Sequence, residues 1–116
     1  MERRRILSGS DGGRPVIVST TSSPGILVHE ANAGHGKQSL VRLFATNIDT
    51  SAVELSIELG GTAHPGDRII VTVPAKSGLY EVVPGLPLDN GLEIRALAAS
   101  ANKILISGYV ELVATK

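Results

Sequence analysis

A short glycine-rich stretch is the chain's first candidate for binding chemistry. Gly34-His35-Gly36-Lys37 has part of a phosphate-binding loop, in which glycines free backbone N–H groups and a lysine pairs with phosphate. That loop also needs a leading glycine and a hydroxyl after the lysine, but the chain has Ala31 and Gln38 at these positions. No helical pattern follows to add its dipole. The pattern therefore indicates a loop between two strands and not a phosphate-binding site.

The three histidines are the residues best suited to metal binding, because neutral imidazole is a common ligand. His29, His35 and His64 are separated by six and twenty-nine residues, and these spacings match no compact ligand motif. We therefore expect solvated histidines, with His29 near a strand end and the other two in loops. The sequence predicts no metal site and no cofactor.

Nucleophilic and acid–base chemistry has no sequence support. Ser77-Gly78 and Ser107-Gly108 lack the Gly-x-Ser-x-Gly turn that exposes a catalytic serine. The acidic residues are spread along the chain without a paired-carboxylate signature. The chain has no cysteine, which excludes a thiolate nucleophile and a disulfide framework. We therefore expect a protein that is not an enzyme.

The strongest local charge feature lies at the N-terminus. Arg3, Arg4 and Arg5 precede Ile6 and Leu7, so a cationic run adjoins a small apolar anchor. Arginine pairs with carboxylates in a bidentate way, which suits docking onto a neighbouring protein. Eleven basic and eleven acidic residues give a net charge of zero, which argues against binding of nucleic acid over the whole surface. These five residues are the predicted protein-interaction site, and a solvated, disordered terminus is the alternative interpretation.

The elements that must carry these residues are strands. In Val53-Glu54-Leu55-Ser56-Ile57-Glu58-Leu59 apolar and polar residues alternate, the pattern of a half-buried strand. Leu55 and Ile57 are expected to face the core, and Glu54, Ser56 and Glu58 the opposite side. Similar patterns predict strands in seven more segments, 15–20, 26–30, 41–45, 69–73, 79–83, 92–98 and 104–106. Turn residues separate them at 23–25, 47–51, 60–66, 84–85 and 89–91.

These signals together predict one all-β domain of about eight strands, with a spacing typical of a sandwich or a barrel; the architecture we expect is an antiparallel β-sandwich. Hydrophobic residues make up 42% of the chain but aromatic residues only 3%, so the core must consist of Val, Ile, Leu and Ala. Residues 1–15 are predicted to be a flexible basic N-terminal arm, because 8–13 is rich in Gly and Ser. Residues 16–116 are predicted to be the sandwich. No apolar run approaches the length of a membrane span.

Six segments between Val41 and Val110 carry a resemblance to a known family. They are LFATN at 43–47, VELSIELGGT at 53–62, VPAKSGL at 73–79, VPGLPLDNG at 83–91, ALAASAN at 96–102 and ISGYV at 106–110. In this order they resemble a family of small structural proteins of tailed bacteriophages. The family pattern often closes with Tyr-Val-Asn-Arg, where this chain has Tyr109-Val110-Glu111-Leu112.

The resemblance implies a jelly-roll-like sandwich in a virion protein. Among such proteins it favours a capsid decoration, or cement, protein that binds the outer head lattice as an oligomer. Its expected partners are the major capsid protein and further copies of itself. Independently of the resemblance, net-zero charge, scarce aromatics and unprotected sheet edges predict a dimer or trimer in solution. Its expected location is the capsid surface, after synthesis in the host cytoplasm, with neither nucleic acid nor membrane as a partner.

Two other functions stay open at this point. A tail, neck or fibre-attachment module of the same virion would share the fold and bind elsewhere. A carbohydrate-binding β-sandwich usually stacks sugar rings on exposed aromatics, for which the chain offers only Phe44, Tyr80 and Tyr109.

Overall fold

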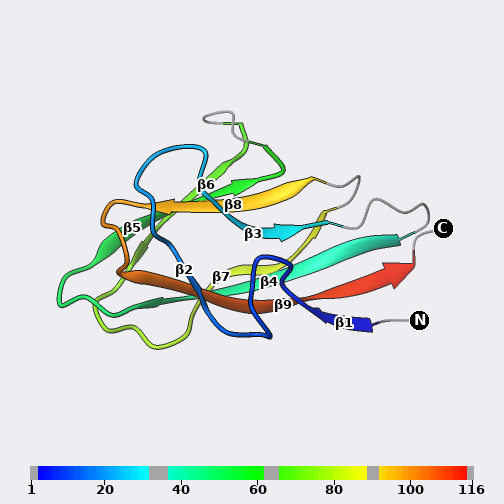
Figure 1. The fold of residues 1–116 in the computed structure, drawn as a ribbon, viewed down its shortest axis with the longest axis horizontal. Coiled ribbons are helices and arrows are strands. Elements are labelled where there is room, and N and C mark those ends of the chain that lie inside the picture. Colours follow the sequence, from blue (N-terminus) through cyan, green and yellow to red (C-terminus); the bar gives the residue numbers. More distant parts are fainter. Residues whose placement is uncertain (1–2, 32–36, 62–65, 89–91, 115–116) are drawn as a thin grey trace.

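Two antiparallel sheets account for all the regular structure in the described residues. The computed structural model describes residues 3–31, 37–61, 66–88 and 92–114, and within them it contains strands and no helix (Figure 1). The strands are β1 (Arg3–Ile6), β2 (Val16–Ile17), β3 (Ile26–Glu30), β4 (Lys37–Asn47), β5 (Val53–Leu59), β6 (Arg68–Val73), β7 (Tyr80–Leu88), β8 (Glu93–Ala98) and β9 (Ile104–Ala114). The predicted all-β sandwich is confirmed.

The strand order is that of a jelly roll. Sheet A has the order β1-β9-β4-β7, with β2 pairing with β9 beyond the end of β1, and sheet B has the order β3-β8-β5-β6. The first half of the chain thus pairs with the second half in reverse: β1 and β2 with β9, β3 with β8, β4 with β7, and β5 with β6. Because β1 and β2 share one position, the sandwich has the eight positions of two Greek keys.

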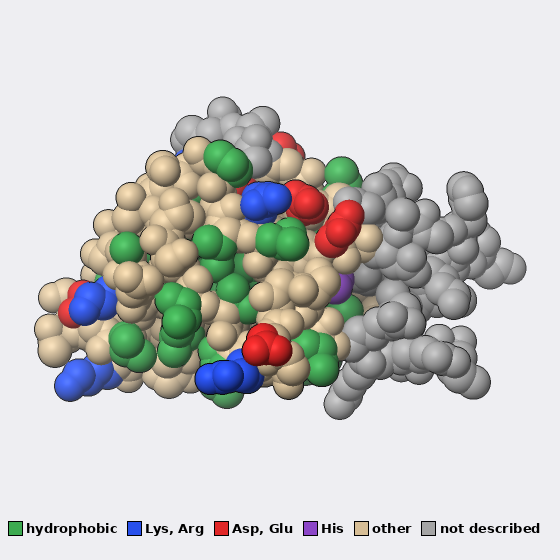
Figure 2. All heavy atoms as spheres, in the orientation of Figure 1, with side chains coloured by type: hydrophobic (Ala, Val, Ile, Leu, Met, Phe, Trp, Pro, Cys, Tyr) green, Lys and Arg blue, Asp and Glu red, His purple; other side chains and the backbone are tan. Residues whose placement is uncertain are grey.

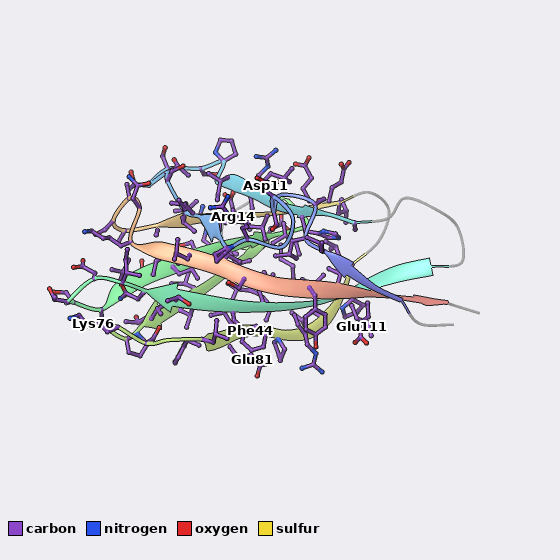
Figure 3. All side chains as sticks on the ribbon, turned by 60° about the horizontal axis from the view of Figure 1, so that its bottom comes forward. Asp11, Arg14, Phe44, Lys76, Glu81 and Glu111 are labelled. Carbon is purple, nitrogen blue, oxygen red and sulfur yellow. The ribbon has the colours of Figure 1, made fainter. Side chains whose placement is uncertain are left out.

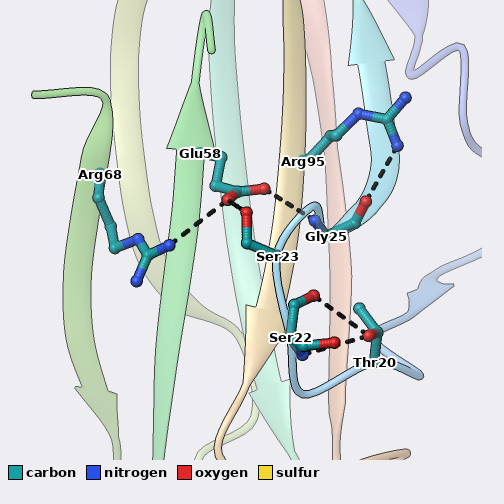
Figure 4. Close-up of polar contacts among 7 residues, drawn as sticks. All are labelled: Thr20, Ser22, Ser23, Gly25, Glu58, Arg68 and Arg95. Atoms are coloured by element: carbon teal, nitrogen blue, oxygen red, sulfur yellow. Dashed lines mark hydrogen bonds and ion pairs between the residues drawn. The ribbon is translucent and has the colours of Figure 1, made fainter. Parts of the chain in front are cut away.

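The alternating pattern of β5 places its side chains as the period of two requires. Leu55 and Ile57 are fully buried between the sheets, as predicted, and Glu54 is exposed on the other side. Ser56 and Glu58 lie on the opposite side, as predicted, but both are buried, so β5 is more deeply covered than the half-buried strand that its pattern indicates. At Glu58 the reason is that residues 20–25 of the chain lie over sheet B (Figure 4).

The predicted turn at Pro84-Gly85 is also wrong, because β7 continues through it. Two register shifts against β4 accommodate the irregular residues, one between Val41 and Arg42 and one between Leu43 and Phe44. Proline lacks the N–H that a central strand needs, but β7 is the edge of sheet A, where its free side tolerates this loss.

The N-terminal residues belong to the sandwich rather than to a separate flexible arm. Arg3–Ile6 forms β1 and pairs with β9 from Tyr109 to Leu112. The following Leu7 is only 2% exposed and belongs to the core. The prediction for residues 1–15 is therefore corrected over the residues the structure describes. A Gly- and Ser-rich composition is typical of a linker, but here Ser8 and Gly9 form a segment that crosses from one sheet to the other in close contact with β3.

That crossing runs from β1 in sheet A to the edge of β3 in sheet B. The Gly9 N–H donates to the Val28 carbonyl at 2.9 Å, and the Glu30 N–H donates to the Ser8 hydroxyl at 2.7 Å. A Cβ on Gly9 would collide with the carbonyl oxygens of Leu27 and Val28, so glycine is needed for this approach. The crossing therefore covers the free edge of β3.

Candidate interaction surfaces

The five residues predicted to contact a partner divide into two groups. Arg3, Arg4, Arg5 and Ile6 form strand β1 at the edge of sheet A, and the Ile6 side chain is exposed. Leu7 is buried in the core, so it is withdrawn from the predicted interaction site. The cause is local alternation: Ile6 pairs opposite Tyr109 and faces outward, and the next residue must face inward.

The histidines do not meet in the described part of the chain. His29 lies in β3 and is buried, so its predicted exposure to solvent is wrong. Its Nδ1 accepts a hydrogen bond from the Ser8 N–H at 3.0 Å, and burial lowers the pKa of the imidazole. His29 is therefore a neutral structural residue that holds the crossing segment. His35 and His64, with residues 34–36 of the glycine-rich stretch, lie outside the described residues.

The described residues also allow a search for a metal site, a reactive serine and a membrane-spanning helix. They contain no group of three or more His, Asp or Glu side chains placed to hold a metal ion. The Ser77 hydroxyl accepts the Asn47 N–H and donates to the Gly78 carbonyl, so it serves the loop between β6 and β7. Among the described residues, no helix has the length and apolar character that crossing a membrane requires.

A buried carboxylate fastens residues 20–25 onto sheet B. Glu58 of β5 is 1% exposed and accepts hydrogen bonds from the Ser23 hydroxyl and from the Gly25 N–H, the latter at 2.8 Å (Figure 4). Arg68 of β6 places its Nη2 3.5 Å from the same carboxylate. On the other side, Arg95 donates to the Gly25 carbonyl at 3.0 Å. The outer face of sheet B is thus partly covered by the protein's own chain.

The electrostatics of Glu58 follow from these contacts. Burial alone raises the pKa of a carboxyl group, because it disfavours the charged form. The hydrogen bonds from Ser23 and Gly25 and the charge of Arg68 outweigh burial, so the pKa of Glu58 lies below its ordinary value. Glu58 is therefore ionised at neutral pH, and its role is to anchor a loop.

The outer face of sheet A has a different character. Its central strands present Arg42, Phe44 and Thr46 from β4 and Leu105, Ser107 and Tyr109 from β9, all half-buried. The inward-facing residues between them, such as Leu43 and Ile106, are fully buried. Figure 3 shows Phe44, Glu81 and Glu111 on this same side of the sheet. Two of the chain's three aromatic side chains therefore lie at the centre of one sheet face.

Aliphatic residues extend this face toward the β1 and β2 edge. Ile6 pairs opposite Tyr109, and Ile17 opposite Leu105, so each exposed isoleucine continues a row of outer side chains. On the β7 side, Arg42 and Glu81 form an exposed ion pair at 3.6 Å. Figure 2 views the sandwich from the side of β1 and β2, where the hydrophobic side chains form small separate groups among charged side chains, other side chains and backbone. Aromatic, aliphatic and charged side chains thus share the outer face of sheet A, and such a mixed composition is usual for protein-binding surfaces.

This face was not among the sequence predictions. The alternation of β4 and β9 indicates which residues point outward, but it does not indicate that the two strands are neighbours. The available signal was the presence of Phe44 and Tyr109 at outward positions of a chain with so few aromatic residues.

Comparison of the chain with family models, with curated proteins and with solved structures found no match.

Proposed function

We propose that this protein is a structural component of a tailed-phage virion, a decoration protein that binds the outer surface of the head and stabilises its lattice. The observation that carries the proposal is the strand order, β1-β9-β4-β7 over β3-β8-β5-β6. The resemblance of six segments implies a jelly-roll-like sandwich, and the pairing of distant strands supports it independently of those segments. Jelly rolls recur in viral capsid domains, although the fold alone does not define a function.

The outer face of sheet A is the surface best suited to contact the major capsid protein. The outer face of sheet B is partly occupied by residues 20–25, whereas sheet A presents Phe44, Tyr109 and the exposed Ile17. With few aromatic anchors, a single contact of this kind is weak. Repetition of the contact across a symmetric lattice compensates through avidity.

The test is binding to expanded heads that lack this protein, prepared from the phage that encodes it. We expect the purified protein to co-sediment with the heads to saturation and to raise their resistance to heat. Cryo-electron microscopy of the decorated heads then gives the position of the density. If the protein fails to bind heads and is found on tails or necks instead, the decoration function is wrong and the tail or neck alternative replaces it.

A matched pair of variants tests the docking face. Ile17 and Ile48 are 52% and 55% exposed, but Ile17 lies on the outer face of sheet A and Ile48 in the loop after β4. Ile17→Glu is expected to weaken binding to heads, because it places a charge in the contact, while Ile48→Glu binds as the unaltered protein does. Equal binding by both variants would remove sheet A as the docking face.

A further inference from the structure

The free edges of the two sheets differ in how they are protected against pairing with another strand. Two prolines, Pro84 and Pro87, and two register shifts make the edge at β7 irregular, and the crossing at Ser8 and Gly9 covers β3. The edge next to β9 is divided between the short strands β1 and β2. These are recognised devices by which proteins keep sheet edges from associating.

Among the residues that the structure describes, none of these devices is found at strand β6. It pairs with β5 in unbroken register, from Arg68 opposite Glu58 to Val73 opposite Val53. It is the edge strand of sheet B. The strand reads RIIVTV, which is β-branched and apolar and contains no proline. Ile70 at its centre is 49% exposed on the outer face. A regular, apolar edge of this kind is a template for a further strand.

The hydrogen-bond pattern identifies which groups face the free side. The Leu59 N–H donates to the Asp67 carbonyl at 2.7 Å, so this pair is a hydrogen-bonded one. Hydrogen-bonded and non-bonded pairs alternate along antiparallel strands. Ile69 and Val71 therefore direct their N–H and C=O groups toward β5. Arg68, Ile70 and Thr72 direct theirs away from it, which leaves three donors and three acceptors along the edge.

We propose that β6 pairs antiparallel with β6 of a second copy of this chain, about a two-fold axis at Ile70. In this register Ile70 lies opposite Ile70 of the other copy, and Arg68 lies opposite Thr72. All the outward N–H and C=O groups of these three residues then find partners. The two exposed isoleucines cover each other, and the two sheets B join into one continuous sheet.

Charge complementarity favours a second copy over an unrelated strand. Across the outer face of sheet B, Arg95, Glu58 and Arg68 lie side by side on β8, β5 and β6. In the proposed register this row continues through Thr72 to the exposed Glu54 of the other copy, since Glu54 and Thr72 pair across β5 and β6. Signs therefore alternate along the row, and no like charges lie directly opposite each other.

The geometry also limits the assembly to two chains. Pairing places both β6 strands in the middle of the joined sheet, and its outer edges are then the two β3 strands. Each β3 is covered by its own crossing segment at Ser8 and Gly9. The contact is isologous and closed, so it gives a dimer and not a filament. It leaves the outer face of sheet A free and does not depend on the proposed head-binding function.

The first test follows mass and amide exchange across a dilution series from millimolar to micromolar protein. In sedimentation velocity we expect the mass to fall from about twice 12.1 kDa toward 12.1 kDa on dilution. In hydrogen exchange followed by NMR, the amides of Ile70 and Thr72 should be protected only at high concentration. The amides of Ile69 and Val71 should be protected throughout, because their partner is β5.

The second test places charges on the two-fold axis. Ile70→Lys brings two ammonium groups opposite each other and should weaken dimerisation by about tenfold or more. Ile70→Glu should do the same, and an equimolar mixture of the two variants should restore the dimer, because Lys then faces Glu. Ile48→Lys, with similar exposure but outside β6, should dimerise as the unaltered protein does.

The outcomes that overturn the proposal are equally specific. It is wrong if the unaltered protein stays at 12.1 kDa throughout the series, or if it dimerises while the Ile70 and Thr72 amides exchange equally fast at all concentrations. It is also wrong if folded Ile70→Lys dimerises normally or if the mixture stays monomeric. Circular dichroism checks folding, and the exchange experiment decides the question should the variants not fold.

Discussion

Replacement of Glu58 by alanine tests whether the buried carboxylate anchors residues 20–25. The change leaves the buried Gly25 N–H without its acceptor and removes the partners of Ser23 and Arg68 (Figure 4). A hydrogen bond to a charged group contributes about 1.5–3 kcal/mol, and removing one partner of a buried ion pair costs about 3–5 kcal/mol. Because these contacts share one carboxylate, we expect a loss of about 3–5 kcal/mol in the free energy of unfolding.

Urea unfolding followed by circular dichroism measures this loss. Glu54→Ala is the matched control, since Glu54 lies on the same strand and the same side but is exposed. It should change the free energy of unfolding by less than about 0.5 kcal/mol. If the two variants lose the same stability, Glu58 does not anchor the loop and the reasoning is refuted.

The pH dependence of the same variant gives a second readout. The pKa of Glu58 is lower in the folded protein than its ordinary value of 4.5. The unfolded chain therefore takes up this proton first, so the contribution of Glu58 is fully present above pH 4.5 and is lost as the pH falls through the folded pKa. The unaltered protein should lose stability over this window, and Glu58→Ala should lose less. Parallel pH profiles would contradict the ionised state of Glu58.

Three further predictions concern the core and the crossing segment. Leu7→Ala should lower the free energy of unfolding in urea by about 2–5 kcal/mol, because Leu7 is buried. Ile6→Ala should change it by less than about 0.5 kcal/mol, because Ile6 is exposed. If Leu7→Ala costs as little as Ile6→Ala, the two residues belong to a flexible arm and not to the core. Leu55→Ala should also cost about 2–5 kcal/mol by the same assay. Burial lowers the pKa of His29 below 6.5, so the unfolded chain binds this proton first and stability should fall as the pH drops from 6.5 toward the folded pKa. Thermal melts across that range should show a flatter profile for His29→Asn, and an unchanged profile would exclude His29 as the titrating group.

The strands could be predicted from the sequence wherever one side faces the core and the other faces water. The alternation of β5 places Leu55 and Ile57 correctly because burial has the same period as the strand. The burial of Glu58 could not be predicted in this way. It depends on Ser23 and Gly25, more than thirty residues earlier in the chain, which fold back over the sheet.

The N-terminal strand was missed for a related reason. Three arginines followed by a Gly- and Ser-rich stretch carry no period of two, and their partner β9 lies at the other end of the sequence. A strand of four residues with one buried neighbour, Leu7, gives too little local signal to be distinguished from a charged tail. The candidate interaction surface was missed likewise, because it exists only where β4, β9 and β1 become neighbours.

The reversed pairing of the chain's two halves fixes the order in which the molecule can be completed during synthesis. β5 and β6 are adjacent in the chain and can pair early, but β1 and β2 must wait for β9, which follows all the other described strands in the chain. Arg3, which pairs with Leu112, cannot find its partner until residue 112 has been synthesised. Folding of such a topology is slow, on the order of milliseconds to seconds, because distant segments must meet first. A chain that stops before β9 loses the neighbour shared by β1, β2 and β4, so premature termination leaves sheet A without its second strand.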